Sequence, residues 1–124
     1  MSKTVLIIDD IPHIRRLLSR MLSASGYQTL LAEDGAQGLE MVREHKPDIV
    51  TCDVSMPIVN GHQFLLSLRQ DPTVSHIPVI MVTALGEEAE GMELTNHGAD
   101  GYITKPFSSS LFIKLIEEVI TSKA

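Results

Sequence analysis

The chain alternates short runs of apolar residues with longer segments in which apolar residues recur every three to four positions. Residues 4–8 and 77–82 are almost solidly apolar, which is typical of strands that are covered on both faces. Residues 48–52 form a third and less regular run. Residues 27–32 and 101–104 mix polar with apolar positions, which favours strands at the edges of a sheet. The pattern therefore predicts five strands.

Helical segments are expected between these strands and after the last one. The first begins near Pro12, where the missing N–H of proline costs little, and ends at Ser25-Gly26. Asp34 is a suitable cap for the second helix, which runs to about His45. The later helices are expected at residues 61–70, 87–96 and 108–121.

The segment 87–96 is expected to be the weakest of these helices. Gly91 lies in its middle and makes a helix about 1 kcal/mol less stable than alanine would. The acidic residues of this segment fit a mostly solvated helix face; they are Glu87, Glu88, Glu90 and Glu93.

This alternation predicts an α/β fold. Parallel strands that are joined by right-handed crossovers form a sheet with helices on both faces, a three-layer sandwich. Because the solid runs should be central and the mixed runs at the edges, the expected order is 2-1-3-4-5, that of doubly wound, flavodoxin-like sheets. The length of 124 residues fits one domain over residues 1–124, with no output domain.

Composition narrows the functional classes. The apolar content of 44% supports a packed core, and the net charge of −6 argues against direct binding to nucleic acid. The single cysteine, Cys52, suits a reducing compartment. The apolar run at residues 5–8 is far too short to cross a membrane. We therefore expect a cytoplasmic protein that does not insert into membranes.

Chemically active side chains follow the strands. Asp9 and Asp10 come after the first strand, Asp53 after the third, Thr83 after the fourth and Lys105 after the fifth. The carboxyl ends of parallel strands form one edge of the sheet, and ligands of open α/β sheets bind there. We therefore expect these five residues to meet in space.

Three carboxylates at one place repel one another unless a cation joins them. Oxygen ligands suit a hard cation that keeps several waters, so Mg²⁺ is the expected metal and Mn²⁺ a substitute. The Asp53 carboxylate is a competent nucleophile toward phosphorus. The Lys105 ammonium could pair with a phosphoryl oxygen, and the Thr83 hydroxyl could donate to another. Phosphoryl transfer needs mainly such positioning and charge stabilisation.

The chain resembles a response-regulator receiver domain of bacterial two-component signalling over nearly all of its length. Four segments carry the resemblance: Asp9-Asp10, Asp53-Val54-Ser55-Met56-Pro57, Thr83-Ala84 and Lys105-Pro106-Phe107. Asn60-Gly61 stands where the family often has Asp-Gly, and both pairs form turns. The resemblance implies a stand-alone receiver that acts as a phosphorylation-controlled switch.

By this resemblance, Asp53 takes a phosphoryl group from a phosphohistidine on a sensor kinase or a phosphotransfer protein. Asp10, Asp53 and the backbone carbonyl of Ser55 would bind Mg²⁺ directly, and Asp9 would act through water. Such a protein catalyses only its own phosphorylation and dephosphorylation, so it is not expected to be an enzyme in the usual sense.

The resemblance also assigns a switch and a structural bond. The Thr83 hydroxyl would move toward the phosphoryl group, and Tyr102 would swing inward to fill the space. The Lys105–Pro106 peptide is expected to be cis. Ser55 and Leu85 lie where the family adjusts the lifetime of the phosphorylated state.

Two surfaces are candidates for partners. Arg15, Arg16 and Arg20 lie on one face of the first helix, either as a plain solvated face or as a docking face for the phosphohistidine partner. The last helix has apolar residues, including Phe112, over an arc wider than one sheet face needs. It is either a deeply buried helix or part of a surface for a downstream protein or a weak dimer.

The sequence leaves three other functions as alternatives. A flavin-binding, flavodoxin-like carrier would need a phosphate-binding loop after the first strand, where Asp9-Asp10-Ile11-Pro12 has the wrong charge. A hydrolytic phosphatase would favour Asp-x-Asp, and here Ser55 follows Asp53 at that spacing. A degenerate receiver that only binds partners is the third alternative, against which the complete set of five positions argues.

Overall fold

The computed structural model describes residues 2–56 and 58–123, and within them five parallel strands form one sheet in the order β2-β1-β3-β4-β5. The strands are β1 (Thr4–Ile8), β2 (Gln28–Ala32), β3 (Ile49–Asp53), β4 (Val79–Thr83) and β5 (Gly101–Thr104). This confirms the predicted fold class and strand order.

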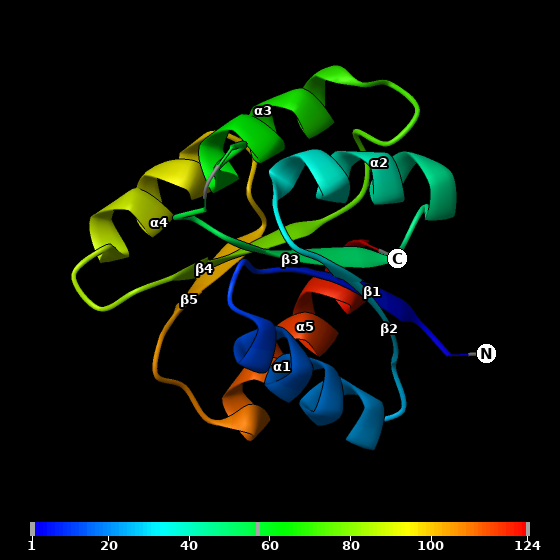
Figure 1. Cartoon of the computed structure of the whole chain (residues 1–124), viewed down its shortest axis with the longest axis vertical. Coiled ribbons are helices and arrows are strands. Elements are labelled where there is room, and N and C mark those ends of the chain that lie inside the picture. The colour runs from blue at the N-terminus through cyan, green and yellow to red at the C-terminus, as the bar shows by residue number, and fades with distance from the viewer. Residues whose placement is uncertain (1, 57, 124) are drawn as a thin grey trace.

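Helices cover both faces of the sheet (Figure 1). The helices are α1 (Pro12–Ala24), α2 (Gly35–His45), α3 (Gly61–Gln70), α4 (Glu88–Asn96) and α5 (Ser109–Lys123). Helices α2, α3 and α4 pack on one face, and α1 and α5 pack on the other. The molecule is the predicted three-layer sandwich.

Side chains of the central strands alternate between two cores. In β1, Leu6 and Ile8 contribute to the core under α2, α3 and α4, while Val5 and Ile7 contribute to the core under α1 and α5. All five residues of β3 and of β4 are buried, whereas β2 has exposed and half-buried positions. Solidly apolar strands are central because both of their faces are removed from water.

The strand boundaries differ slightly from the prediction. Strand β3 was expected at residues 48–52 and β4 at 77–82, but Asp53 and Thr83 are the last residues of the observed strands. The pairing of Asp53 with Val82 extends the ladder by one position. Both side chains therefore belong to the rigid end of the sheet rather than to the loops.

Helix α3 begins directly against the end of β3. Asn60 and Gln63 form a reciprocal capping box, with the Gln63 amide donating to the Asn60 side chain at 3.0 Å. A Cβ on Gly61 would lie 2.7 Å from the Asp53 carbonyl oxygen, so glycine permits this close approach. The start of α3 is thereby held close to the end of β3, and the Gly61 amide donates to the Val54 carbonyl at 3.0 Å.

The partner-binding role expected of Phe112 is wrong. Its side chain is fully buried, in the core under α1 and α5, and its ring packs 5.1 Å from that of Phe107. Ile116 is buried beside it. The wide apolar arc of α5 therefore serves mainly to fill the core, and Leu111 is an exposed member of the arc.

Ile58, between β3 and α3, provides a test of backbone strain. It has φ +68°, a left-handed conformation that is unfavourable for a β-branched residue, and its side chain is 78% exposed. We expect Ile58→Asn to raise the free energy of unfolding by about 1 kcal/mol, because asparagine tolerates this conformation. Urea unfolding of both proteins measures the change.

Leu85→Asn is the matched control, since Leu85 is 80% exposed and has no positive φ. It removes a similar apolar side chain without relieving backbone strain. Equal effects of the two substitutions, or a loss of stability in Ile58→Asn, would contradict the explanation by strain.

Candidate functional site at the carboxyl edge of the sheet

Asp9, Asp10 and Asp53 meet as predicted. Each offers a carboxylate oxygen, and these oxygens all lie within 4.8 Å of one another. Strands β1 and β3 are direct neighbours, with Ile8 opposite Cys52, so the two chain segments leave the sheet side by side. Asp9 and Asp53 are buried, and Asp10 is exposed.

Lys105 provides the opposite charge. Its ammonium nitrogen lies 3.3 Å from Asp9 Oδ2 and 3.5 Å from Asp53 Oδ2. The backbone N–H of Lys105 donates to the Thr83 carbonyl at 2.8 Å, which fixes the start of this segment at the end of β4. The Lys105–Pro106 peptide is cis, as expected. One lysine therefore bridges two of the three carboxylates.

Asp9 is buried but well supplied with partners. Its Oδ1 accepts a hydrogen bond from the Ile11 amide at 2.9 Å, and its Oδ2 faces Lys105. Its carbonyl oxygen accepts from the Arg15 guanidinium at 2.6 Å. Helix α1 itself begins after Ile11, which makes no side-chain cap bond to the described residues. Asp9 thus shapes the loop after β1 without capping the helix.

The Asp53 carboxyl is harder to ionise than an ordinary aspartate. Burial raises its pKa to about 6, and the nearby carboxylates of Asp9 and Asp10 act in the same direction. Lys105 and the Ser55 amide, which donates to Oδ1 at 3.4 Å, lower the pKa but do not cancel this rise. Burial therefore outweighs the effect of the Lys105 ammonium on this carboxyl.

Thr83 and Tyr102 lie on the neighbouring strands β4 and β5, and both approach Gly91 of α4. The Thr83 hydroxyl is 2.8 Å from the Thr104 hydroxyl and 3.4 Å from the Ile103 carbonyl oxygen, so its partners are on β5. Tyr102 is half-buried and packs against the core under α4. Their predicted switch role would require the Thr83 hydroxyl to leave these partners.

Gly91 has a packing role that sequence reasoning missed. A Cβ at this position would lie 2.7 Å from Tyr102 Cδ2 and 3.0 Å from Thr83 Cγ2. The glycine was interpreted only as a weak point of α4. The structure shows that it lets the helix approach the ring of Tyr102, which no local sequence pattern reveals.

Glu87 is a second residue whose role the sequence did not reveal, because the acidic residues of this segment fit a mostly solvated helix face. Its Oε2 accepts from the Ser55 hydroxyl at 2.8 Å, and its Oε1 accepts from the Ala84 amide at 2.8 Å. The Ala84 amide, then the Ser55 hydroxyl, lower the pKa of Glu87. The signal that could have found it is its position three residues after Ala84, as in a capping box.

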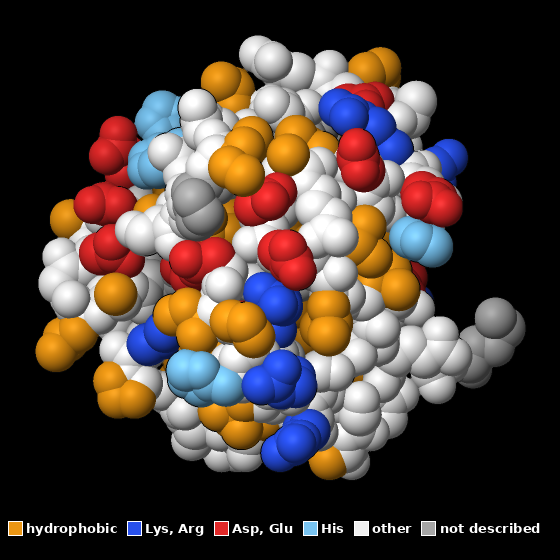
Figure 2. All heavy atoms as spheres, in the orientation of Figure 1, with side chains coloured by type: hydrophobic (Ala, Val, Ile, Leu, Met, Phe, Trp, Pro, Cys, Tyr) orange, Lys and Arg blue, Asp and Glu red, His pale blue; other side chains and the backbone are white. Residues whose placement is uncertain are grey.

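A shallow hollow of about 470 Å³ lies beside the acidic cluster. It is lined by Asp10, Val54, Ser55, Met56, Asn60, His62 and Glu90. Figure 2 shows Asp and Glu side chains gathered around the centre of this face and Lys and Arg side chains below them, over α1. Arg16, on α1, is exposed, while Arg15 is half-buried and donates to the Asp9 carbonyl.

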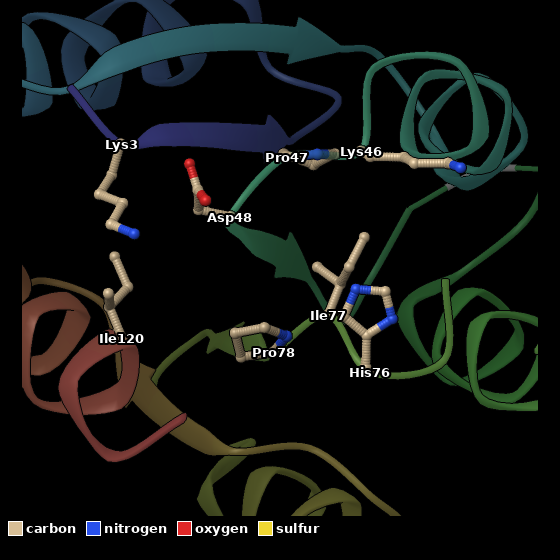
Figure 3. Close-up of a pocket in the computed structure, with 8 residues that line it drawn as sticks. All are labelled: Lys3, Lys46, Pro47, Asp48, His76, Ile77, Pro78 and Ile120. Atoms are coloured by element: carbon tan, nitrogen blue, oxygen red, sulfur yellow. The ribbon is translucent and has the colours of Figure 1, made fainter. Parts of the chain in front are cut away.

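Another pocket, of about 230 Å³, lies at the opposite edge of the sheet. Figure 3 shows Lys3, Asp48 and Ile120 around it, with Lys46 directed away. Asp48 Oδ2 accepts from the Thr4 amide at 2.7 Å, so this carboxylate serves the start of β1. The described lining contains none of the predicted site residues, and the acidic edge remains the candidate site.

Comparison with known proteins agrees with this geometry. The family model for the response regulator receiver domain matches residues 5–117. The chain belongs to the response regulator receiver domain family. The polar-differentiation response regulator DivK of Brucella anthropi is 34% identical to this receiver over 120 residues, 97% of this chain and 98% of DivK.

Solved structures place the receiver in the same family. The response regulator 1452 receiver domain of Francisella has a TM-score of 0.89 and 28% identity, covering 99% of this chain and 100% of that one. A response regulator receiver domain protein of Clostridium thermocellum has a TM-score of 0.90 and 26% identity, over 98% and 96%. Brucella abortus NtrX has a TM-score of 0.92 and 25% identity, over 99% of this chain and 28% of its own.

Family membership implies phosphorylation-controlled signalling in a bacterial two-component system. It favours the receiver over the flavin carrier and the phosphatase that the sequence left as alternatives. In residues 2–56 and 58–123, no helix has the length and apolar character needed to cross a membrane.

The raised pKa of Asp53 leads to a prediction about stability and pH. The folded state holds the Asp53 proton up to about pH 6, whereas an unfolded aspartate loses it near its ordinary value of 3.8. The folded state therefore binds more protons between these values, and the contribution of Asp53 to stability falls as pH rises. Two pKa units correspond to about 2–3 kcal/mol.

We therefore expect Asp53→Asn to gain stability relative to the unsubstituted protein as pH rises from 4 to 7 in chelator, by about 2–3 kcal/mol. Urea unfolding at each pH gives the difference. Glu40→Gln, which neutralises an exposed carboxylate on α2, is the control and should show a nearly constant difference. A constant difference for Asp53→Asn would contradict the burial argument.

Proposed function

We propose that this receiver accepts a phosphoryl group on Asp53 from a phosphohistidine donor. One oxygen of the Asp53 carboxylate forms the new P–O bond. The P–N bond to the donor imidazole breaks, and its electron pair returns to the nitrogen, which takes up a proton. The observation that carries the proposal is the meeting of three carboxylates with the Lys105 ammonium 3.5 Å from Asp53.

The donor set fits a divalent cation of the Mg²⁺ type. Three carboxylate oxygens within 4.8 Å of one another are hard ligands, and the Lys105 ammonium alone leaves the cluster negative. Asp10 and Asp53, with the backbone carbonyl of Ser55, would hold the cation, and Asp9 would act through water. When bound, the cation supplies positive charge that favours an incoming phosphoryl group.

The protein's own residues supply the remaining interactions. Lys105 can transfer its ion pair from the Asp53 carboxylate to a phosphoryl oxygen, because its ammonium already lies beside Asp53. The Thr83 hydroxyl can exchange Thr104 for a phosphoryl oxygen, since it ends the strand next to β3. Tyr102, which packs against Gly91 as Thr83 does, would then change its position, and the populations of two surface conformations would shift.

The signal would pass to a downstream protein through α4, β5 and α5. Leu111 and Met92 are exposed apolar side chains on this side of the molecule. A single-domain receiver is supported by DivK, of which the alignment covers 98%. The oligomeric state, a monomer or a weak dimer, is still a prediction. The cytoplasmic location is also a prediction.

The direct test is incubation with acetyl phosphate, which releases acetate as the new bond forms. We expect intact-protein mass spectrometry to find one added phosphoryl group, dependent on Mg²⁺ or Mn²⁺ and abolished by chelator. Asp53→Asn should abolish labelling because it removes the nucleophile.

Asp48→Asn is the control, since this acid lies at the opposite edge of the sheet and should leave labelling unchanged. Labelling that persists in Asp53→Asn would refute the assignment of the nucleophile. A complete lack of labelling in the unsubstituted protein would favour the degenerate receiver that only binds partners.

Arg16 tests the docking face on α1. Arg16 is exposed in the second turn of α1, the helix that follows Asp9 and Asp10, whereas Arg15 also supports the loop after β1 and is less suitable for substitution. We expect Arg16→Ala to slow transfer from a phosphorylated histidine protein severalfold and to leave labelling by acetyl phosphate unchanged, because only the former needs protein docking.

Lys46→Ala removes an exposed charge at the end of α2, on the other face of the sheet from α1, and should alter neither reaction. Quenched-flow gels that separate the phosphorylated species give both rates. If Arg16→Ala slows the two reactions equally, the arginine acts on the chemistry or the fold, and the docking interpretation is wrong.

A further inference from the structure

The Glu87 side chain joins the two loops that flank the candidate site. One carboxylate oxygen accepts from the Ser55 hydroxyl and the other from the Ala84 amide, each at 2.8 Å. Ser55 is two residues beyond Asp53, and Ala84 directly follows Thr83. A single side chain therefore connects the segment after β3 with the segment after β4.

Local capping-type geometry can account for the bond to Ala84, three residues away, but not for the bond to Ser55, which is 32 residues away in sequence. Glu87 is the N-cap residue of α4, but its side chain makes no cap hydrogen bond within the described part of that helix. The carboxylate instead turns back to Ala84 and Ser55. Its neighbour Glu88 makes a purely local contact, accepting from the Gly86 amide. Hydrogen bonds of an ionised carboxylate are stronger than neutral ones, so the bridge should restrain both loops.

A phosphoryl group on Asp53 would compete with this bridge. The Ser55 amide already donates to Asp53 Oδ1 at 3.4 Å, so the segment held by Glu87 is in contact with the reacting carboxylate. Phosphoryl oxygens are strong acceptors that attract nearby N–H and O–H donors. They also add negative charge close to the Glu87 carboxylate, which raises the free energy of the bridged arrangement.

We propose that Glu87 is a positioning residue, a clasp that holds the loops after β3 and β4 in the unphosphorylated arrangement and opens when Asp53 carries a phosphoryl group. The inference rests on the proposed phosphorylation of Asp53. The clasp opposes phosphorylation, so its removal speeds labelling and prolongs the labelled state. Its members are Ser55, Ala84 and Glu87.

The first experiment measures labelling by acetyl phosphate with saturating Mg²⁺, in the full chain. Glu87→Gln removes the charge, and Glu87→Asp keeps the charge but is one methylene too short to span both donors. Both should label about tenfold faster, the equivalent of one charge-assisted hydrogen bond. Glu88→Gln makes the same charge change one residue away and should label at the unsubstituted rate.

Ser55→Ala tests the other end of the clasp. It removes the hydroxyl but retains the backbone carbonyl that is proposed to face the metal. We expect faster labelling here as well, and little further increase in the double variant with Glu87→Gln, because both substitutions break the same bridge. Full additivity would contradict a shared bridge.

The second experiment needs no phosphorylation. Amide hydrogen exchange by NMR should show the Ala84 N–H protected in the unsubstituted protein and in Glu88→Gln. Exchange should be about tenfold faster in Glu87→Gln, again the equivalent of one such bond. Unchanged exchange at Ala84 would overturn the clasp, and thermal melts confirm that each variant is folded.

The two experiments separate the possible failures. If the unsubstituted protein is labelled at Asp53 but the Glu87 variants label at the same rate, the clasp is overturned and the proposed function stands. If Glu87→Asp behaves as the unsubstituted protein while Glu88→Gln matches Glu87→Gln, charge alone acts and the clasp is overturned. If nothing is labelled although Ala84 exchange responds, the proposed function fails, and the regulatory role of the clasp fails with it.

Discussion

The fold brings like charges together at one edge of a sheet, and everything else at that edge responds to this constraint. Strands β1 and β3 are neighbours in a fully buried part of the sheet, so Asp9 and Asp53 leave it side by side. Burial of the two hydrophobic cores stabilises this arrangement by far more free energy than the repulsion between the carboxylates costs. Lys105 offsets part of the repulsion, and burial, with smaller contributions from Asp9 and Asp10, raises the pKa of Asp53.

The same constraint explains how a change at Asp53 can reach the surface. Two contacts lead away from the carboxylate cluster. One runs through Thr83 to Gly91 in α4, against which the ring of Tyr102 also packs. The other runs through Ser55 and Glu87 to the start of the same helix. Both contacts end on α4. A shift of this helix between two arrangements would therefore change both contacts with the site.

The sequence was sufficient for the elements, the strand order and the meeting of Asp9, Asp10, Asp53 and Lys105, because burial and parallel topology dictate them. It was insufficient where long-range packing decides. Phe112 lies on a helix with apolar residues on most sides, and periodicity alone could not show which side faces the core. Gly91 and Glu87 gained their roles from contacts with Tyr102 and Ser55, which are distant in sequence.

The central claim is that the acidic edge binds one divalent cation, and an NMR titration of the ¹⁵N-labelled protein with Mg²⁺ tests it most directly. The account predicts saturable shifts with a stoichiometry of one, largest at the amides of Asp9, Asp10, Asp53 and Ser55. Shifts that do not saturate, or that centre on residues around Asp48 at the opposite edge, would contradict it.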